Sequence, residues 1–96
     1  MLPPPIVHVI DDESDVCLAL ASLLDAAGHN IRCYSSGEEF FEKFDPAIPG
    51  CIIADVCMPG MSGITLQERL VQSNVSIPVI ILGNRDRMIS AEPVRQ

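Results

Sequence analysis

The stretch IVHVIDD, residues 6–12, decides the fold, because a short apolar run ends there in two adjacent acids, Asp11 and Asp12. A second apolar run, residues 51–54, ends in a third acid, Asp55. Continuous apolar runs of this length are typical of strands that are buried on both faces of a parallel sheet. If the two runs are neighbouring parallel strands, their carboxyl ends lie side by side and the three carboxylates converge at one edge of the sheet.

Three converging carboxylates would require a counter-charge. Two unit charges about 4 Å apart repel by roughly 4 kcal/mol at an effective dielectric constant near 20. No lysine or arginine lies next to these acids in the sequence. The basic residues of the chain are Arg32, Lys43, Arg69, Arg85, Arg87 and Arg95. A divalent metal ion is therefore a better candidate for neutralisation than a proton or a basic side chain.

The size and charge of the chain narrow its function. A chain of 96 residues forms one domain with one core. The net charge of -7 argues against direct binding of nucleic acid, which requires a basic face. No apolar stretch approaches the ~20 residues of a membrane span, and residues 1–5 lack the basic region of a secretory signal. We therefore expect a cytoplasmic protein that does not bind a membrane, and its four cysteines, which show no C-x-x-C spacing, are expected to be reduced.

The apolar pattern alternates between the periods of strands and helices. Strands that are buried on both faces are predicted at residues 6–10, 51–54 and 79–82. Residues 31–34 alternate in polarity and predict a half-exposed strand at one margin of the sheet. The order of strands and helices along the chain implies right-handed crossovers and a doubly wound parallel sheet.

Three helices are predicted between these strands. The first begins at Ser14, which can cap it, and ends before Gly28. The second begins at a capping box of a serine and a glutamate. Two registers are open for this box, Ser35 with Glu38 and Ser36 with Glu39. The third helix follows a turn at residues 59–63 and is indicated by the apolar residues Ile64, Leu66, Leu70 and Val71.

Two motifs resemble the receiver domain of bacterial two-component response regulators. They are Val9-Ile10-Asp11-Asp12-Glu13 and Asp55-Val56-Cys57-Met58-Pro59-Gly60-Met61-Ser62-Gly63, and the resemblance covers about residues 6–82. It implies a flavodoxin-like (CheY-like) α/β fold with strand order 2-1-3-4. We place the receiver core at residues 1–82. Residues 83–96 are expected to be a divergent or truncated tail that replaces the fourth helix and the fifth strand–helix unit.

The resemblance also implies a function in phosphorelay signalling. Asp55 would accept a phosphoryl group from the phosphohistidine of a sensor histidine kinase. Mg²⁺ would be held directly by Asp12, Asp55 and the backbone carbonyl of Cys57, and through water by Asp11. Such a domain is a signalling phosphoacceptor and not an enzyme, because at most it catalyses its own phosphorylation and dephosphorylation.

The chain departs from the family pattern at two residues that would contact the phosphoryl group. Receivers use a Thr or Ser that ends the fourth strand and a Lys that ends the fifth; here Gly83 follows residues 79–82, and no fifth strand is expected. The main alternative is therefore a degenerate or truncated receiver that acts as a phosphorylation-independent interaction module. Residues 79–82 would form an apolar edge strand, which predicts self-association through that edge or marginal stability.

Two other classes of protein use a similar sheet and are disfavoured. A phosphatase of the dehalogenase type carries a second aspartate two positions after its nucleophile, where this chain has Cys57. A flavin or nucleotide carrier has Gly, Ser and Thr at its first turn, where backbone N–H groups bind phosphate. This chain has acids at that turn, residues 11–13, which repel an anion.

Several other residues are predicted to have packing or solvent roles only. His8, in an apolar strand, and His29, after the end of a helix, are not placed to act as bases. Tyr34 is expected at the surface, because it ends a marginal strand. Met58 and Met61 are expected to pack within their loop.

Overall fold

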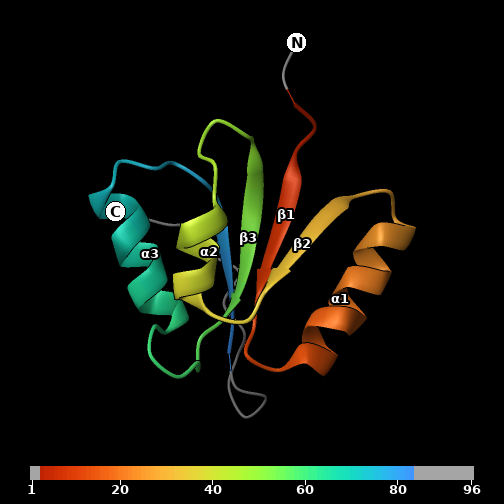
Figure 1. Cartoon of the computed structure of the whole chain (residues 1–96), viewed down its shortest axis with the longest axis horizontal. Helices are drawn as coiled ribbons and strands as arrows, with labels where there is room; N and C mark the ends of the chain where they lie inside the picture. The colour runs from red at the N-terminus through yellow and green to blue at the C-terminus, as the bar shows by residue number, and fades with distance from the viewer. Residues whose placement is uncertain (1–2, 84–96) are drawn as a thin grey trace.

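The computed structural model describes residues 3–83, which form a four-stranded parallel sheet and three helices (Figure 1). The strands are β1 (Ile6–Ile10), β2 (Asn30–Tyr34), β3 (Gly50–Asp55) and β4 (Val79–Leu82). The helices are α1 (Ser14–Ala26), α2 (Gly37–Lys43) and α3 (Gly63–Gln72). The sheet order is β2-β1-β3-β4, which confirms the predicted doubly wound fold. Apart from Gly83, the predicted tail lies outside the described residues.

Helices cover the two faces of the sheet unequally. Figure 1 shows α1 on one side of the sheet and α2 and α3 on the other. The main core lies on the side of α2 and α3, because its members come from these helices, the loop before α3 and all four strands. These buried residues are Ile10, Tyr34, Phe40, Ile52, Ala54, Met58, Met61, Leu66, Leu70 and Val79.

The side that α1 covers is less well buried. Cys17 is the one buried residue of α1, whereas Leu18 and Leu23 are 65% and 69% exposed. The strand residues that alternate with the main core are half-buried; they are Cys51, Ile53, Ile80 and Leu82. The prediction of burial on both faces is therefore correct for β1 except at Val7, but wrong for β3 and β4, because α1 alone covers this side in the described part of the chain.

The helix starts differ in how they are capped. Ser14 was a predicted cap and is not one: α1 has Glu13 at its N-cap position, without a side-chain hydrogen bond. For α2 the structure selects Ser36, whose Oγ accepts the N–H of Glu39 at 3.0 Å. The Glu39 carboxylate returns to the N–H of Ser35 and not to that of Ser36. Gly28, with φ of 91°, follows the end of α1 as expected.

The apolar residues that predicted α3 are only partly buried in the structure. Leu66 and Leu70 are buried, but Ile64 and Val71 are 47% and 50% exposed. Each exposed residue lies about 100° around the helix from a buried neighbour, Gly63 or Leu70, and therefore points to the edge of the buried stripe. Within residues 3–83, every helix falls short of the length and hydropathy that crossing a membrane requires.

Tyr34 is buried, so its predicted surface position is wrong. Its hydroxyl lies 2.9 Å from Nδ1 of His8, which is also buried. Both rings pack against Phe40 of α2 at centroid distances of 5.4 and 5.3 Å. An edge strand was expected to expose its last aromatic residue, but α2 turns back over the end of β2 and covers it.

Candidate metal and phosphoacceptor site

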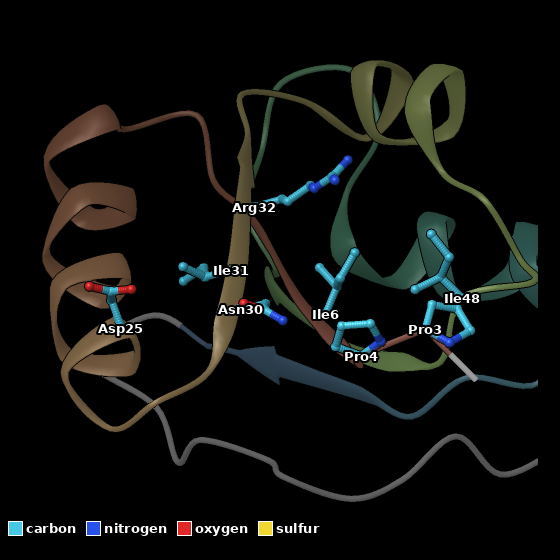
Figure 2. Close-up of a pocket in the computed structure, with 8 residues that line it drawn as sticks. All are labelled: Pro3, Pro4, Ile6, Asp25, Asn30, Ile31, Arg32 and Ile48. Atoms are coloured by element: carbon cyan, nitrogen blue, oxygen red, sulfur yellow. The ribbon is translucent and has the colours of Figure 1, made fainter. Parts of the chain in front are cut away.

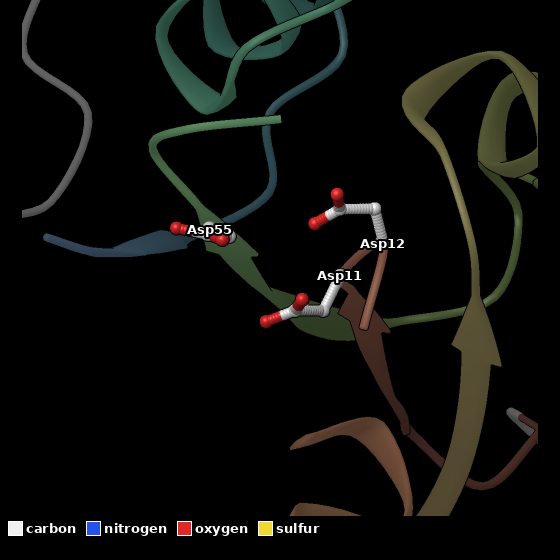
Figure 3. A group of neighbouring side chains, drawn as sticks. All are labelled: Asp11, Asp12 and Asp55. Carbon is white, nitrogen blue, oxygen red and sulfur yellow. The ribbon is translucent and has the colours of Figure 1, made fainter. Parts of the chain in front are cut away.

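Three carboxylates converge at the carboxyl ends of β1 and β3. The two strands pair in parallel with Ile10 opposite Ala54, so Asp11 follows one strand where Asp55 ends the other. One oxygen from each of Asp11, Asp12 and Asp55 lies within 4.8 Å of the others. Figure 3 shows the first two acids leaving β1 and the third leaving β3. The structure thus brings together the acids that the sequence predicted to meet.

The turn after each strand is fixed by a hydrogen bond from a backbone N–H to the aspartate carboxylate two residues earlier. Oδ1 of Asp11 accepts the N–H of Glu13 at 2.9 Å, and Oδ1 of Asp55 accepts the N–H of Cys57 at 3.2 Å. Bonds between a side chain and the backbone two residues later are typical of Asp in turns. Because each bond engages one oxygen, the second oxygen of each carboxylate remains available to a ligand.

The electrostatics of the cluster favour a cation. Asp11 is 6% exposed, and burial raises the pKa of its carboxyl; the charges of Asp55, Asp12 and Glu13 raise it further, against the hydrogen bond from Glu13. Within residues 3–83 no basic side chain forms an ion pair with these acids. A set of carboxylate oxygens in this arrangement suits a hard divalent ion such as Mg²⁺.

The loop after Asp55 is fixed by close contacts with α2 and α3. A Cβ on Gly37, the first residue of α2, would lie 2.6 Å from Sδ of Met61. A Cβ on Gly63, the first residue of α3, would lie 2.9 Å from the backbone oxygen of Asp55. Met58 and Met61 have the predicted packing role, but they pack into the main core and not only within their loop. Sequence reasoning did not identify Gly37, because only the tertiary structure places it against this loop.

The structure describes two further predicted features of the site, the position of Cys57 and the missing hydroxyl group at the end of β4. Cys57 is exposed and its N–H bonds to Asp55, but its role as a carbonyl ligand stays a prediction. At the end of β4, Leu82 pairs with Asp55, and its oxygen accepts the N–H of Val56 at 2.9 Å. Because Gly83 follows, the end of β4 supplies no hydroxyl group beside the acids.

A shallow pocket of ≈ 450 Å³ lies at the opposite end of the sheet (Figure 2). Pro4 and Ile6 line it at the start of β1, together with Asp25 and Arg32. Figure 2 shows the last two residues on opposite sides of β2, so they do not form a paired site for a ligand. The acids, not this pocket, are the candidate functional site.

Comparison with known proteins identifies the family. The sequence model of the response regulator receiver domain matches residues 7–95. The chain is 32% identical over 91 residues to the response regulator protein TmoT of Ectopseudomonas mendocina, which covers 94% of this chain and 41% of that protein. The chain therefore belongs to the response regulator receiver family, whose domains act in signalling. It spans about two fifths of the length of the curated relatives it matches.

Solved structures agree with this assignment. The response regulator StyR superposes with a TM-score of 0.84 at 35% identity, over 92% of this chain and 45% of that chain. The response regulator TrrA of Thermotoga maritima, solved in complex with Mg²⁺ and BeF, gives a TM-score of 0.69 at 26% identity, over 82% of this chain and 69% of that chain. The family match continues past Leu82, so the predicted domain boundary there stays a prediction.

Proposed function

We propose that this receiver domain accepts a phosphoryl group on Asp55 from a sensor histidine kinase, and that Mg²⁺ supports the transfer. The observation that carries the proposal is the cluster of three carboxylates at the ends of β1 and β3. Family membership supplies the class of chemistry. The complex of TrrA with Mg²⁺ and BeF adds support, because that protein belongs to the same class of regulator.

In this proposal, each residue of the site has a separate role in binding Mg²⁺ or the phosphoryl group. Asp12, Asp55 and the carbonyl of Cys57 would hold Mg²⁺, and Asp11 would hold it through water. When bound, Mg²⁺ neutralises negative charge on the carboxylates and on the phosphoryl oxygens. A carboxylate oxygen of Asp55 forms the new bond to phosphorus while the phosphorus–nitrogen bond of the phosphohistidine breaks, and the histidine nitrogen keeps the electron pair. The product is an acyl phosphate.

The end of β4 favours a second candidate function. Leu82 and Gly83 offer no hydroxyl to the phosphoryl oxygens, and positioned donors supply much of the catalysis of phosphoryl transfer. A receiver without this donor would be phosphorylated slowly, or would act as an interaction module that does not depend on phosphorylation. The interaction module differs from both a fast and a slow phosphoacceptor, because its acids would bind no phosphoryl group.

The location and partners complete the proposal. A cytoplasmic location fits the four free cysteines, because reducing compartments keep thiols unpaired. The net charge of -7 fits a protein partner better than nucleic acid. We therefore expect the kinase, and not DNA, to be the direct partner of these residues.

Beryllium fluoride added with Mg²⁺ tests the phosphoacceptor, because it mimics a phosphoryl group on aspartate. In the wild-type chain we expect amide NMR shifts at residues 11–13 and 55–63. The variant Asp55→Asn should lose these shifts, whereas the matched control Asp25→Asn, an exposed acid at the far end of α1, should keep them. An unchanged wild-type spectrum with both reagents present would support the interaction module.

A further inference from the structure

Two thiols lie together on the α1 side of the sheet. Cys17 belongs to α1 and is 5% exposed, and Cys33 belongs to the edge strand β2 and is exposed. The sulfur of Cys33 lies 3.5 Å from the backbone oxygen of Cys17. The sulfur of Cys17, in turn, lies 3.8 Å from the backbone oxygen of Val9, the residue that Cys33 faces on β1. The pair combines one thiol that solvent reaches with one that it does not.

The fold holds this pair in place. Cys33 pairs with Val9 across β1 and β2, and the thiol of Cys17 contacts the backbone oxygen of the same Val9 at 3.8 Å. Both cysteines are therefore positioned against one residue in the middle of the sheet. The two cysteines come from α1 and β2, regular elements that pack directly against each other.

We propose that Cys17 and Cys33 form a redox-active dithiol that a small-molecule disulfide, such as oxidised glutathione, converts into an intramolecular disulfide bond. Both cysteines are free in the structure. In a reducing compartment the bond would form only when the thiol pool is oxidised, as transient disulfides do.

The reaction proceeds in two exchanges. The Cys33 sulfur, as thiolate, attacks one sulfur of the small disulfide; the old S–S bond breaks, and one small thiolate leaves and takes up a proton. Cys17 then loses its proton and attacks the Cys33 sulfur, and the second small thiol leaves. The two cysteines lose two electrons and two protons, and the small disulfide gains them as two thiols.

Burial makes the second exchange the slow step. It raises the pKa of the Cys17 thiol to about 12, with further contributions from the neighbouring Cys33 thiol and the charge of Asp11. The rate of bond formation should therefore increase about tenfold for each pH unit between roughly 7 and 9, in proportion to the thiolate of Cys17. A mixed disulfide on Cys33 should accumulate first.

Cys57 is an internal comparison. It is also exposed, but no thiol contact of Cys57 is found among residues 3–83. Oxidised glutathione should modify it and stop at the mixed disulfide. The difference between the two exposed cysteines is therefore the neighbouring Cys17 and not exposure.

Peptide mapping of the native, full chain treated with oxidised glutathione tests the pair. Trypsin cleaves after Arg32, Lys43 and Arg69, which places Cys17, Cys33 and the other two cysteines on three different peptides. We expect peptide 1–32 linked to peptide 33–43, released by reduction, and peptide 44–69 carrying glutathione. A stable adduct on Cys33 without the link, or a link to peptide 44–69 instead, would overturn the proposal.

Two variants and a melting curve complete the test. Cys33→Ser should abolish the link and protect Cys17 from glutathione, while Cys51→Ser, at a half-buried position on β3, should leave the link unchanged. The disulfide should raise the melting temperature on the order of 10 °C, because it constrains the unfolded chain between residues 17 and 33. Modification of Cys17 in folded Cys33→Ser at the wild-type rate would show that the exposed thiol is not needed and would refute the mechanism.

Discussion

Two glycines occupy positions that other residues tolerate poorly, for different physical reasons. A Cβ on Gly50, at the start of β3, would overlap the backbone oxygen of Ile6 on β1. Gly28, at the end of α1, has open space around its Cα but a φ of 91°. The first position is limited by packing and the second by backbone conformation.

Alanine at these two glycines should separate the two effects. Gly50→Ala should lower the free energy of unfolding by about 3 kcal/mol, because backbone atoms of β1 must shift. Gly28→Ala should cost about 1 kcal/mol, because only the left-handed conformation is strained. Urea unfolding followed by circular dichroism measures both, and equal losses would contradict the packing argument.

His8 predicts how stability depends on pH. Its Nε2 is buried without a hydrogen-bond partner among residues 3–83, and burial first and the charge of Arg32 second lower the pKa of His8. Between the lowered pKa of His8 and about pH 6.5, the folded protein therefore binds fewer protons than the unfolded chain. The free energy of unfolding should fall as the pH decreases from 6.5, by up to about 1.4 kcal/mol per unit.

The variant His8→Asn tests whether His8 causes this dependence of stability on pH. Asparagine retains a group that can meet the Tyr34 hydroxyl, but it does not titrate. Its unfolding free energy should change less between pH 7.5 and pH 5.5 than that of the wild type. The same dependence on pH in both proteins would assign it to other residues.

For single residues, the sequence predicted the position of the three acids but not the packing of Tyr34 and His8 against Phe40. Asp11, Asp12 and Asp55 were predictable because strand ends in a parallel sheet meet at one edge. The burial of Tyr34 was not, because it depends on how α2 folds back over β2. The contact between Cys17 and Cys33 likewise follows from the packing of α1 on β2, which no local pattern specifies.

Among the elements, the helix caps show how a local motif can mislead. Ser14 has a favourable residue type for a cap, but Asp11 binds the N–H of Glu13, and α1 begins with Glu13 at the N-cap position. Ser36 does cap α2, because the chain there is extended and its Oγ reaches the N–H of Glu39. Both serines fit the sequence rule, and only the backbone conformation distinguishes them.

Alanine at the two serines tests this distinction. Ser36→Ala should lower the free energy of unfolding by about 1 kcal/mol, which is the usual value of a lost N-cap. Ser14→Ala, the matched control in the first turn of α1, should change it by less than about 0.5 kcal/mol. A larger loss for Ser14→Ala than for Ser36→Ala would indicate that α1 uses its serine in solution.

Across the whole molecule, one face of the sheet is less covered than the other. The apolar periods and right-handed crossovers were enough to predict the order of the four strands. They could not predict the half-buried state of Ile53 and Ile80, because burial on that face depends on what else packs beside α1. The predicted self-association through β4 stays a prediction.

Sedimentation at several concentrations tests that association. Ile80→Lys places a charge on β4 at the half-buried face and should weaken self-association at least tenfold, because a charged edge strand pairs poorly. Val71→Lys, at a half-exposed apolar position of α3, should leave it unchanged. A wild-type chain that stays monomeric at high concentration and melts cooperatively above ~60 °C would contradict the prediction.

The contact between Met61 and Gly37 couples the loop after Asp55 to the start of α2. The loop that starts at Asp55 cannot move as a unit without displacing the beginning of α2, because the methionine sulfur occupies the space directly over the glycine. The neighbouring Glu38 lies beside Gly60 of the same loop. If Asp55 accepts a phosphoryl group, as proposed, a movement of this loop would therefore also displace the start of α2, on the opposite side of the sheet from α1.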